Sequence, residues 1–180
     1  MKNHHYYLLG LISLLCGMIL FAWFNEFILI RTPFNTQTYT PPVRASKKTV
    51  TLHFWHTDAW HTETQDIIWH TDAASNLYYL LKAWLNILDE EQVLDKKVGL
   101  QTALIAASGH EAYISFDRNL FDKTASTFEK WMLIEGLLKT IRENNIPIQQ
   151  VQLLVHHQPL HDMHLDFSKA WRIEGFIAII

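Results

Sequence analysis

The sequence is short of cysteine and of charge, and it has no basic block; each shortage narrows the class of protein. The one cysteine, Cys16, excludes a disulfide framework within a single chain. It lies in the apolar N-terminal run, so the remainder has no thiol, which suits an oxidising compartment. Charged residues make up 18% and the formal net charge is -3, so we expect no nucleic-acid partner, because such binding needs a positive patch.

Hydrophobic residues are plentiful by contrast. They make up 49% of the 180 residues, and tryptophan and histidine are frequent. This length and composition predict one ordinary domain with a packed core and a small appendage.

The appendage is the N-terminus. Residues 6–24 carry no charge and are long enough to cross about 30 Å of hydrocarbon as a helix. We therefore expect residues 1–30 to be an uncleaved membrane anchor. A cleaved signal peptide has a shorter apolar core. A lipid anchor on Cys16 is the other alternative, although Leu15 stands where a small residue is expected.

The orientation of the anchor rests on weaker signals. Lys2 precedes the apolar run and Arg31 follows it, so the positive charges close to the span nearly balance. A short N-terminal tail usually stays in the cytoplasm. We therefore expect a single-pass protein whose domain is extracytoplasmic, on the periplasmic or outer face.

The rest of the chain divides by composition. Residues 31–48 contain three prolines and predict a linker, residues 49–174 a folded domain, and residues 175–180 an apolar tail too short to span a membrane. Alternating and helical periodicities give the expected elements. Strands are expected at 49–55 and 67–70 around a polar loop at 58–66, at 100–107 and 111–117, and at 148–156. The first expected helix buries Leu77, Leu80, Leu81, Trp84 and Leu88. The second, at 126–144, has a buried stripe of Phe128, Trp131, Ile134, Leu138 and Ile141.

This order predicts an α+β fold of β-α-β-β-α-β type, a mostly antiparallel sheet with two helices packed on one face, preceded by the N-terminal transmembrane helix. The second face of the sheet is then free to meet a partner.

Three segments resemble the GerMN domain family. Residues 112–121 (AYISFDRNLF) look like its strand and turn, residues 137–141 (LLKTI) like the end of its second helix, and residues 151–155 (VQLLV) like its last core strand. The likeness covers roughly residues 49–160, and Thr140 matches a recurrent threonine. The chain departs from the family at His156 and His157, where a glycine usually follows the strand. The resemblance implies an envelope module that binds or assembles, with no catalytic residues and no cofactor, and with envelope proteins or a second copy as partners.

Histidines suggest an alternative function. The tetrads that begin at Trp55, Trp60 and Trp69 read WHTD, WHTE and WHTD, and a second group follows residue 155. Imidazoles near carboxylates can bind zinc or copper. The candidate ligands are His56, His61, His156 and His161. No HExxH helix and no cysteine ligands accompany them, and solvated histidines beside turn-capping threonine and aspartate explain the same pattern.

A hydrolase is a more distant alternative. His161, Asp162, His164 and Asp166 can serve acid-base chemistry, but the nucleophile would have to be Ser108 or Ser115. Ser108 lies in an expected hairpin and not in a nucleophile elbow.

The tryptophans allow two interpretations. Trp55, Trp60 and Trp69 are candidates for partner-binding anchors, because tryptophan is favoured at interfaces. They can equally close the bottom of the core, and the sequence leaves both open.

Overall fold

The computed structural model describes residues 13–14, 17–18, 46–122 and 124–175. Most of the expected anchor at 1–30, the linker as far as residue 45 and the tail at 176–180 lie outside the described residues. Within the described ranges, no helix is long and apolar enough to cross a membrane.

The domain begins with a long hairpin. Strand β1 (Ser46–His56) pairs antiparallel with β2 (Ala59–Trp69) without a register shift. Thr57 and Asp58 connect them with φ of 47° and 59°, the two left-handed conformations of a type I′ turn. Val50, Leu52 and Phe54 of β1 are buried, as predicted.

The expected loop at 58–66 is wrong, because most of these residues belong to β2. This strand pairs with β1 on one edge only, and its residues 62–66 are all exposed. An exposed strand needs no apolar alternation, so the sequence lacks the pattern that identifies a half-buried strand.

The first long helix, α2 (Ala73–Glu90), agrees with its periodicity. The Asp72 side chain caps its start by accepting a hydrogen bond from the Ser75 amide at 2.7 Å. The predicted apolar positions, Leu77, Leu80, Leu81, Trp84 and Leu88, are all fully buried.

Helix α3 (Thr127–Glu143) starts at the predicted capping box of Ser126 and Glu129. Ile134, Leu138 and Ile141 are buried as expected, but Phe128 is 55% exposed and Trp131 is 36% exposed. Their assignment to the core is wrong, because the first turn of α3 lies beside the hairpin tip and projects Phe128 onto its surface.

The second sheet is mixed. It contains β3 (Leu100–Ile105), β4 (Glu111–Phe116), β5 (Gln150–Val155), β6 (Gln158–Pro159) and β7 (Trp171–Arg172). β3 pairs antiparallel with β4 across the predicted hairpin, and β6 and β7 both pair antiparallel with β5. β4 and β5 are parallel, because α3 connects them as a crossover. The α+β class is confirmed, and the sheet is antiparallel except at this pair.

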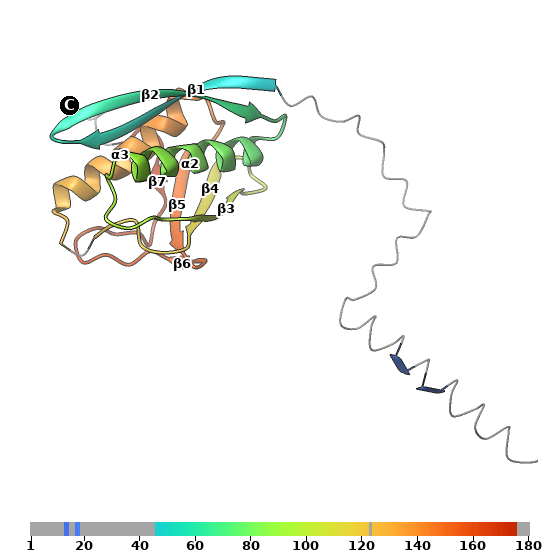
Figure 1. The fold of residues 1–180 in the computed structure, drawn as a ribbon. Helices are drawn as coiled ribbons and strands as arrows, with labels where there is room; N and C mark the ends of the chain where they lie inside the picture. Colours follow the sequence, from blue (N-terminus) through green and yellow to red (C-terminus); the bar gives the residue numbers. More distant parts are fainter. Residues whose placement is uncertain (1–12, 15–16, 19–45, 123, 176–180) are drawn as a thin grey trace, which may run out of the picture. The chain divides into compact units, whose positions relative to one another are not determined.

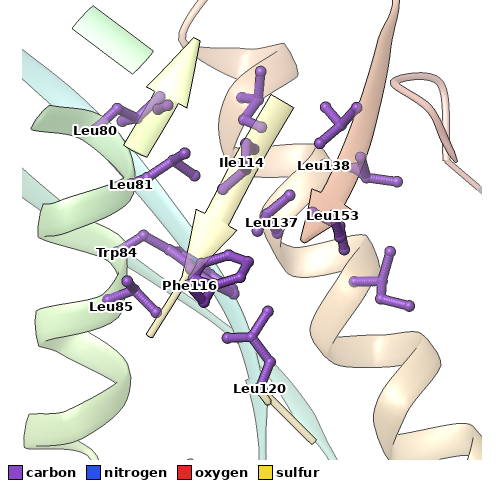
Figure 2. Packing of buried hydrophobic residues seen from close by; sticks show 14 of the residues in the cluster. Leu80, Leu81, Trp84, Leu85, Ile114, Phe116, Leu120, Leu137, Leu138 and Leu153 are labelled. Carbon is purple, nitrogen blue, oxygen red and sulfur yellow. The ribbon is translucent and has the colours of Figure 1, made fainter. Parts of the chain in front are cut away.

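The prediction that both helices cover one face of a single sheet is wrong. The β1–β2 hairpin is a separate two-stranded sheet, and α2 and α3 lie between it and the β3–β7 sheet (Figure 1). The apolar core fills this arrangement, with Trp84 of α2 meeting Phe116 of β4 near its centre and Leu137 of α3 beside Leu153 of β5 (Figure 2).

Helix α3 seals the free edge of β1. The Thr140 hydroxyl accepts a hydrogen bond from the His53 amide at 2.9 Å. The Asn144 side chain accepts from the Thr51 amide at 3.1 Å and donates to the Thr51 carbonyl at 2.7 Å. Gly136 makes this approach possible, since an added Cβ would lie 2.9 Å from the His53 carbonyl oxygen. The threonine that resembles a recurrent family residue thus joins the two parts of the fold.

The turn after β5 explains the departure from the GerMN pattern. His156 and His157 have φ of 50° and 63° and form a two-residue connection between Val155 and Gln158. The histidines adopt the left-handed conformation that glycine usually supplies.

The outer face of the second sheet is partly covered. Gln152 of β5 is only 9% exposed, and its amide donates to the Phe167 carbonyl in the segment after β6. Leu104 and Tyr113, opposite each other on β3 and β4, remain exposed. The free face that the sequence predicts is therefore limited to its β3–β4 side.

Candidate functional site

Aromatic side chains gather where the hairpin turns. Trp55 and Trp60 are directly opposite each other in the β1–β2 register, and their rings meet edge to face with centroids 5.5 Å apart. Phe128 of α3 meets Trp55 edge to face at 5.8 Å. We call Trp55, Trp60 and Phe128 the tip cluster. Phe128 is more than half exposed and the tryptophans are half-buried, so the tip cluster is a surface feature.

The third candidate tryptophan lies elsewhere. Trp69 is at the opposite end of the hairpin, where the Lys48 ammonium stands 3.7 Å above its ring centroid. Lys48 also donates to the Asn144 carbonyl at the end of α3. Trp69 therefore shields the joint between the hairpin and α3, and it does not belong to the tip cluster.

Sequence reasoning missed Phe128 as a surface residue. Its spacing from Ile134 and Leu138 fits the buried stripe of a helix, and only the placement of the hairpin tip exposes it. The stripe extends one turn beyond the core, which periodicity cannot reveal.

The four candidate metal ligands do not form one group. His56 and His61 are at the hairpin tip with ring centroids 6.3 Å apart, and the His61 imidazole donates from Nε2 to the His56 carbonyl. His156 is in the β5–β6 turn, 3.3 Å from the Gln101 amide, and His161 follows β6. Figure 1 shows β6 and the hairpin on opposite sides of the helices. Among the described residues, no three His, Cys, Asp or Glu side chains are placed to hold a metal ion.

The residues considered for hydrolysis have structural partners. The buried Ser115 hydroxyl donates to Gln101 and accepts from the His157 amide. Asp166 accepts from the amide and hydroxyl of Ser168, and Asp162 is bound to Lys130. No serine in this set is hydrogen-bonded to a histidine side chain, so the arrangement does not provide an activated nucleophile.

A cleft of about 500 Å³ lies beside the tip cluster. Trp55 forms part of its wall, and its lining includes the carboxyl groups of Asp58, Asp95 and Asp122 from loops and of Glu129 from the first turn of α3. The hydrogen bond between the side chains of Asp95 and Asp122 raises the pKa of Asp95 and lowers the pKa of Asp122. Glu129 is committed to the capping box, accepting from the Ser126 amide at 2.7 Å.

Lys130, which also lines the cleft, forms a buried ion pair. Lys130 Nζ lies 2.6 Å from Asp162 Oδ2, and the two side chains are 4% and 6% exposed. Burial raises the pKa of Asp162, but the hydrogen bonds from Lys130 and from the His164 and Leu165 amides outweigh it, so the pKa is lowered. Asp162 therefore stays ionised and ties the segment after β6 to the start of α3.

A second buried contact fixes the hairpin to α3. His53 is 4% exposed, with Nε2 2.6 Å from the Glu143 carboxylate and Nδ1 3.1 Å from the Thr62 hydroxyl. Burial lowers the pKa of His53 more than Glu143 raises it. The imidazole is thus neutral at pH 7, with Nε2–H donating to Glu143 and Nδ1 accepting from Thr62.

Several solved structures are similar to this chain. The chain is similar to a Clostridium perfringens protein described as a lipoprotein, at 21% identity over 72% of this chain and 89% of that chain, with a TM-score of 0.48. It is also similar to the tandem GerMN domains of the sporulation protein GerM from Bacillus subtilis, at 13% identity over 69% of this chain and 46% of that chain, with a TM-score of 0.44. The first GerMN domain alone gives 14% identity over 67% and 92%, with a TM-score of 0.42.

These similar structures include GerMN domains, the family that residues 112–121, 137–141 and 151–155 resemble. At these identities the similarity concerns the fold alone. No protein-family model and no curated protein sequence matches the chain.

Proposed function

We propose that this protein is a non-catalytic binding or assembly module of the cell envelope. Residues 1–30 hold it at a membrane, and the folded domain at residues 49–174 is on the extracytoplasmic side. The observation that carries the proposal is the tip cluster, in which Trp55, Trp60 and Phe128 offer aromatic surface at the end of a long hairpin. Aromatic side chains of this kind dominate the binding energy of protein interfaces.

The chemistry around the tip cluster supports binding over catalysis. The Lys139 ammonium stands 5.4 Å from the Trp60 ring centroid, and Trp55 borders the adjacent cleft. Aromatic rings flanked by a cation and by carboxylates form a surface with an apolar centre and a polar rim, which is the usual anatomy of an interface. The resemblance of the sequence to GerMN domains points to the same class of function.

In-cell photocrosslinking of the full-length chain tests the proposal. A photoreactive residue at Phe128 is expected to capture an envelope protein, and the same probe at Asn86, an exposed residue of α2, is the matched control. Trp55→Ala in the Phe128-probe chain is expected to reduce capture at least tenfold, as truncation of an interface anchor does. Equal capture from both positions, or capture unaffected by Trp55→Ala, would refute a role for the tip cluster.

The location of the domain needs a separate test. In a Cys16→Ser background, Asn86→Cys introduces one exposed thiol. A thiol reagent that cannot cross membranes is expected to label this protein in intact cells. Labelling only after lysis would place the domain in the cytoplasm and overturn the proposed location.

A further inference from the structure

The outer edge of β2 is open along its length. β1 has β2 on one edge and the side chains of α3 on the other, whereas β2 has β1 alone. Among the described residues, none forms a hydrogen bond with the backbone groups of β2 that face away from β1. Such an edge is a template for another strand unless the protein blocks it with proline, lysine or a bulge. β2 contains no proline, lysine or arginine, and its register with β1 is uninterrupted.

The backbone groups that face outward can be identified. The backbone amides and carbonyls of Thr51 and His53 are hydrogen-bonded to side chains of α3 and α2. These backbone groups therefore point away from β2. Their neighbours Val50 and Leu52 therefore make the ladder bonds, to Gln65 and Glu63. Since outward and inward residues alternate, the outward set on β2 is Trp60, Thr62, Thr64, Asp66 and Ile68.

We propose that this edge pairs with the same edge of a second copy, antiparallel, about a twofold axis through Thr64. Thr64 is the middle residue of β2, so this register pairs the two strands over their whole length. Trp60 then meets Ile68 of the other copy, and Thr62 meets Asp66, each as a hydrogen-bonded pair. The inference deepens the proposed function by naming a second copy as a partner, and it rests on the proposed assembly role.

The side chains complement one another in this register. Ile68 is 52% exposed in the single chain, and the pairing covers it with Trp60. The two carboxylates of the strand avoid each other, because Glu63 meets Gln65 and Asp66 meets Thr62. A shift of the register by two residues sets Trp60 against Asp66 and shortens the overlap. Complementary cross-strand pairs stabilise a strand pairing, so the symmetric register is favoured.

The surrounding surface is compatible with a strand from outside. Residues 62–66 are exposed on both faces of the hairpin, and neither helix covers them. A twofold interface uses the same patch on both subunits and closes after two copies. Of the tip cluster and the cleft, only Trp60 belongs to the paired strands. The pairing leaves its contact with Trp55 in place.

Disulfide trapping of the full-length chain tests the register. In a hydrogen-bonded antiparallel pair the facing Cα atoms are about 5.5 Å apart, within the range that a disulfide spans. Thr64→Cys in the Cys16→Ser background is expected to give a disulfide-linked dimer under mild oxidation in membranes. Thr62→Cys is the matched control, because its copies would be about 14 Å apart in this register. Monomer from Thr64→Cys, or equal dimer from both variants, would overturn the proposal.

Charge at the axis provides an independent measurement. Thr64→Lys sets two like charges directly opposite each other and is expected to weaken self-association about fivefold in sedimentation experiments with the detergent-solubilised chain. Thr64→Glu behaves in the same way, and mixing the two variants restores association. Asn86→Lys adds the same charge on α2 and leaves it unchanged. Capture through Phe128 in the Thr64→Lys protein keeps the two proposals distinguishable: if neither Thr64 variant affects association while capture persists, the pairing is wrong and the binding module stands.

Discussion

The buried pair of Lys130 and Asp162 yields an asymmetric prediction. Asp162 has three donors, the Lys130 ammonium at 2.6 Å and the amides of His164 and Leu165 at 2.9 and 3.2 Å. Lys130 is bonded to Asp162 alone within the described part of the chain. Removing the lysine leaves a carboxylate with two backbone donors, whereas removing the carboxylate charge leaves an ammonium ion buried without compensation.

The magnitudes follow from this difference. Asp162→Asn keeps the shape of the side chain but places an uncharged amide group beside the ammonium. The free energy of unfolding should therefore fall by about 3–5 kcal/mol. Lys130→Met fills the same space with apolar atoms and costs about 1–3 kcal/mol, the loss of one hydrogen bond to a buried acceptor. The double variant should cost less than the sum of the two, since neither charge then remains uncompensated.

Urea unfolding of the four proteins, followed by circular dichroism, measures these differences. Domains are stable by about 5–15 kcal/mol, so the larger loss is a substantial part of the total. If Asp162→Asn costs less than about 1 kcal/mol, or less than Lys130→Met, the ammonium is hydrated and the reasoning fails.

Three further predictions concern the joint between the hairpin and α3. Thr140→Val should cost about 1–3 kcal/mol in urea unfolding because it leaves the buried His53 amide without an acceptor, while Thr140→Ser retains the hydroxyl and most of the stability. Gly136→Ala usually gains about 1 kcal/mol within a helix, but here the Cβ meets the His53 carbonyl, and we expect a lower melting temperature. The lowered pKa of His53 means that the unfolded chain takes up the proton first, so the stability from this neutral imidazole is complete above about pH 6.5 and falls as the pH drops toward the folded pKa. His53→Gln should flatten that slope, and an unchanged slope would contradict the assignment.

Local signals in the sequence were enough to predict the two helices. The spacing of Leu77, Leu81 and Trp84 needs only one buried face, and the Ser126–Glu129 capping box acts within a single turn. The β3–β4 hairpin is also local, with Gly109 at φ 76°.

The features that sequence reasoning missed depend on contacts between distant segments. β2 is polar because it has no sheet neighbour beyond β1 and no covering layer over residues 62–66, so no pattern distinguishes it from a loop. The separate layer formed by the hairpin depends on α3 replacing a third strand beside β1.

The candidate site was predicted in part. Trp55 and Trp60 come together because a two-residue turn sets them opposite each other, whereas Trp69 is separated from them by the length of the strand. The histidines do not converge, because the segments that carry them lie on opposite sides of the helices (Figure 1).

The hydrogen bonds between α3 and β1 require the rise along the helix to match the rise along the strand. Four helical residues advance about 6 Å, and two strand residues advance about 6.8 Å. Thr140 and Asn144 therefore keep pace with His53 and Thr51 along the strand. One residue inserted between Thr140 and Asn144 would rotate the second contact by about 100° and remove it. In related sequences, insertions and deletions should thus be absent from this part of α3 and tolerated at the hairpin tip.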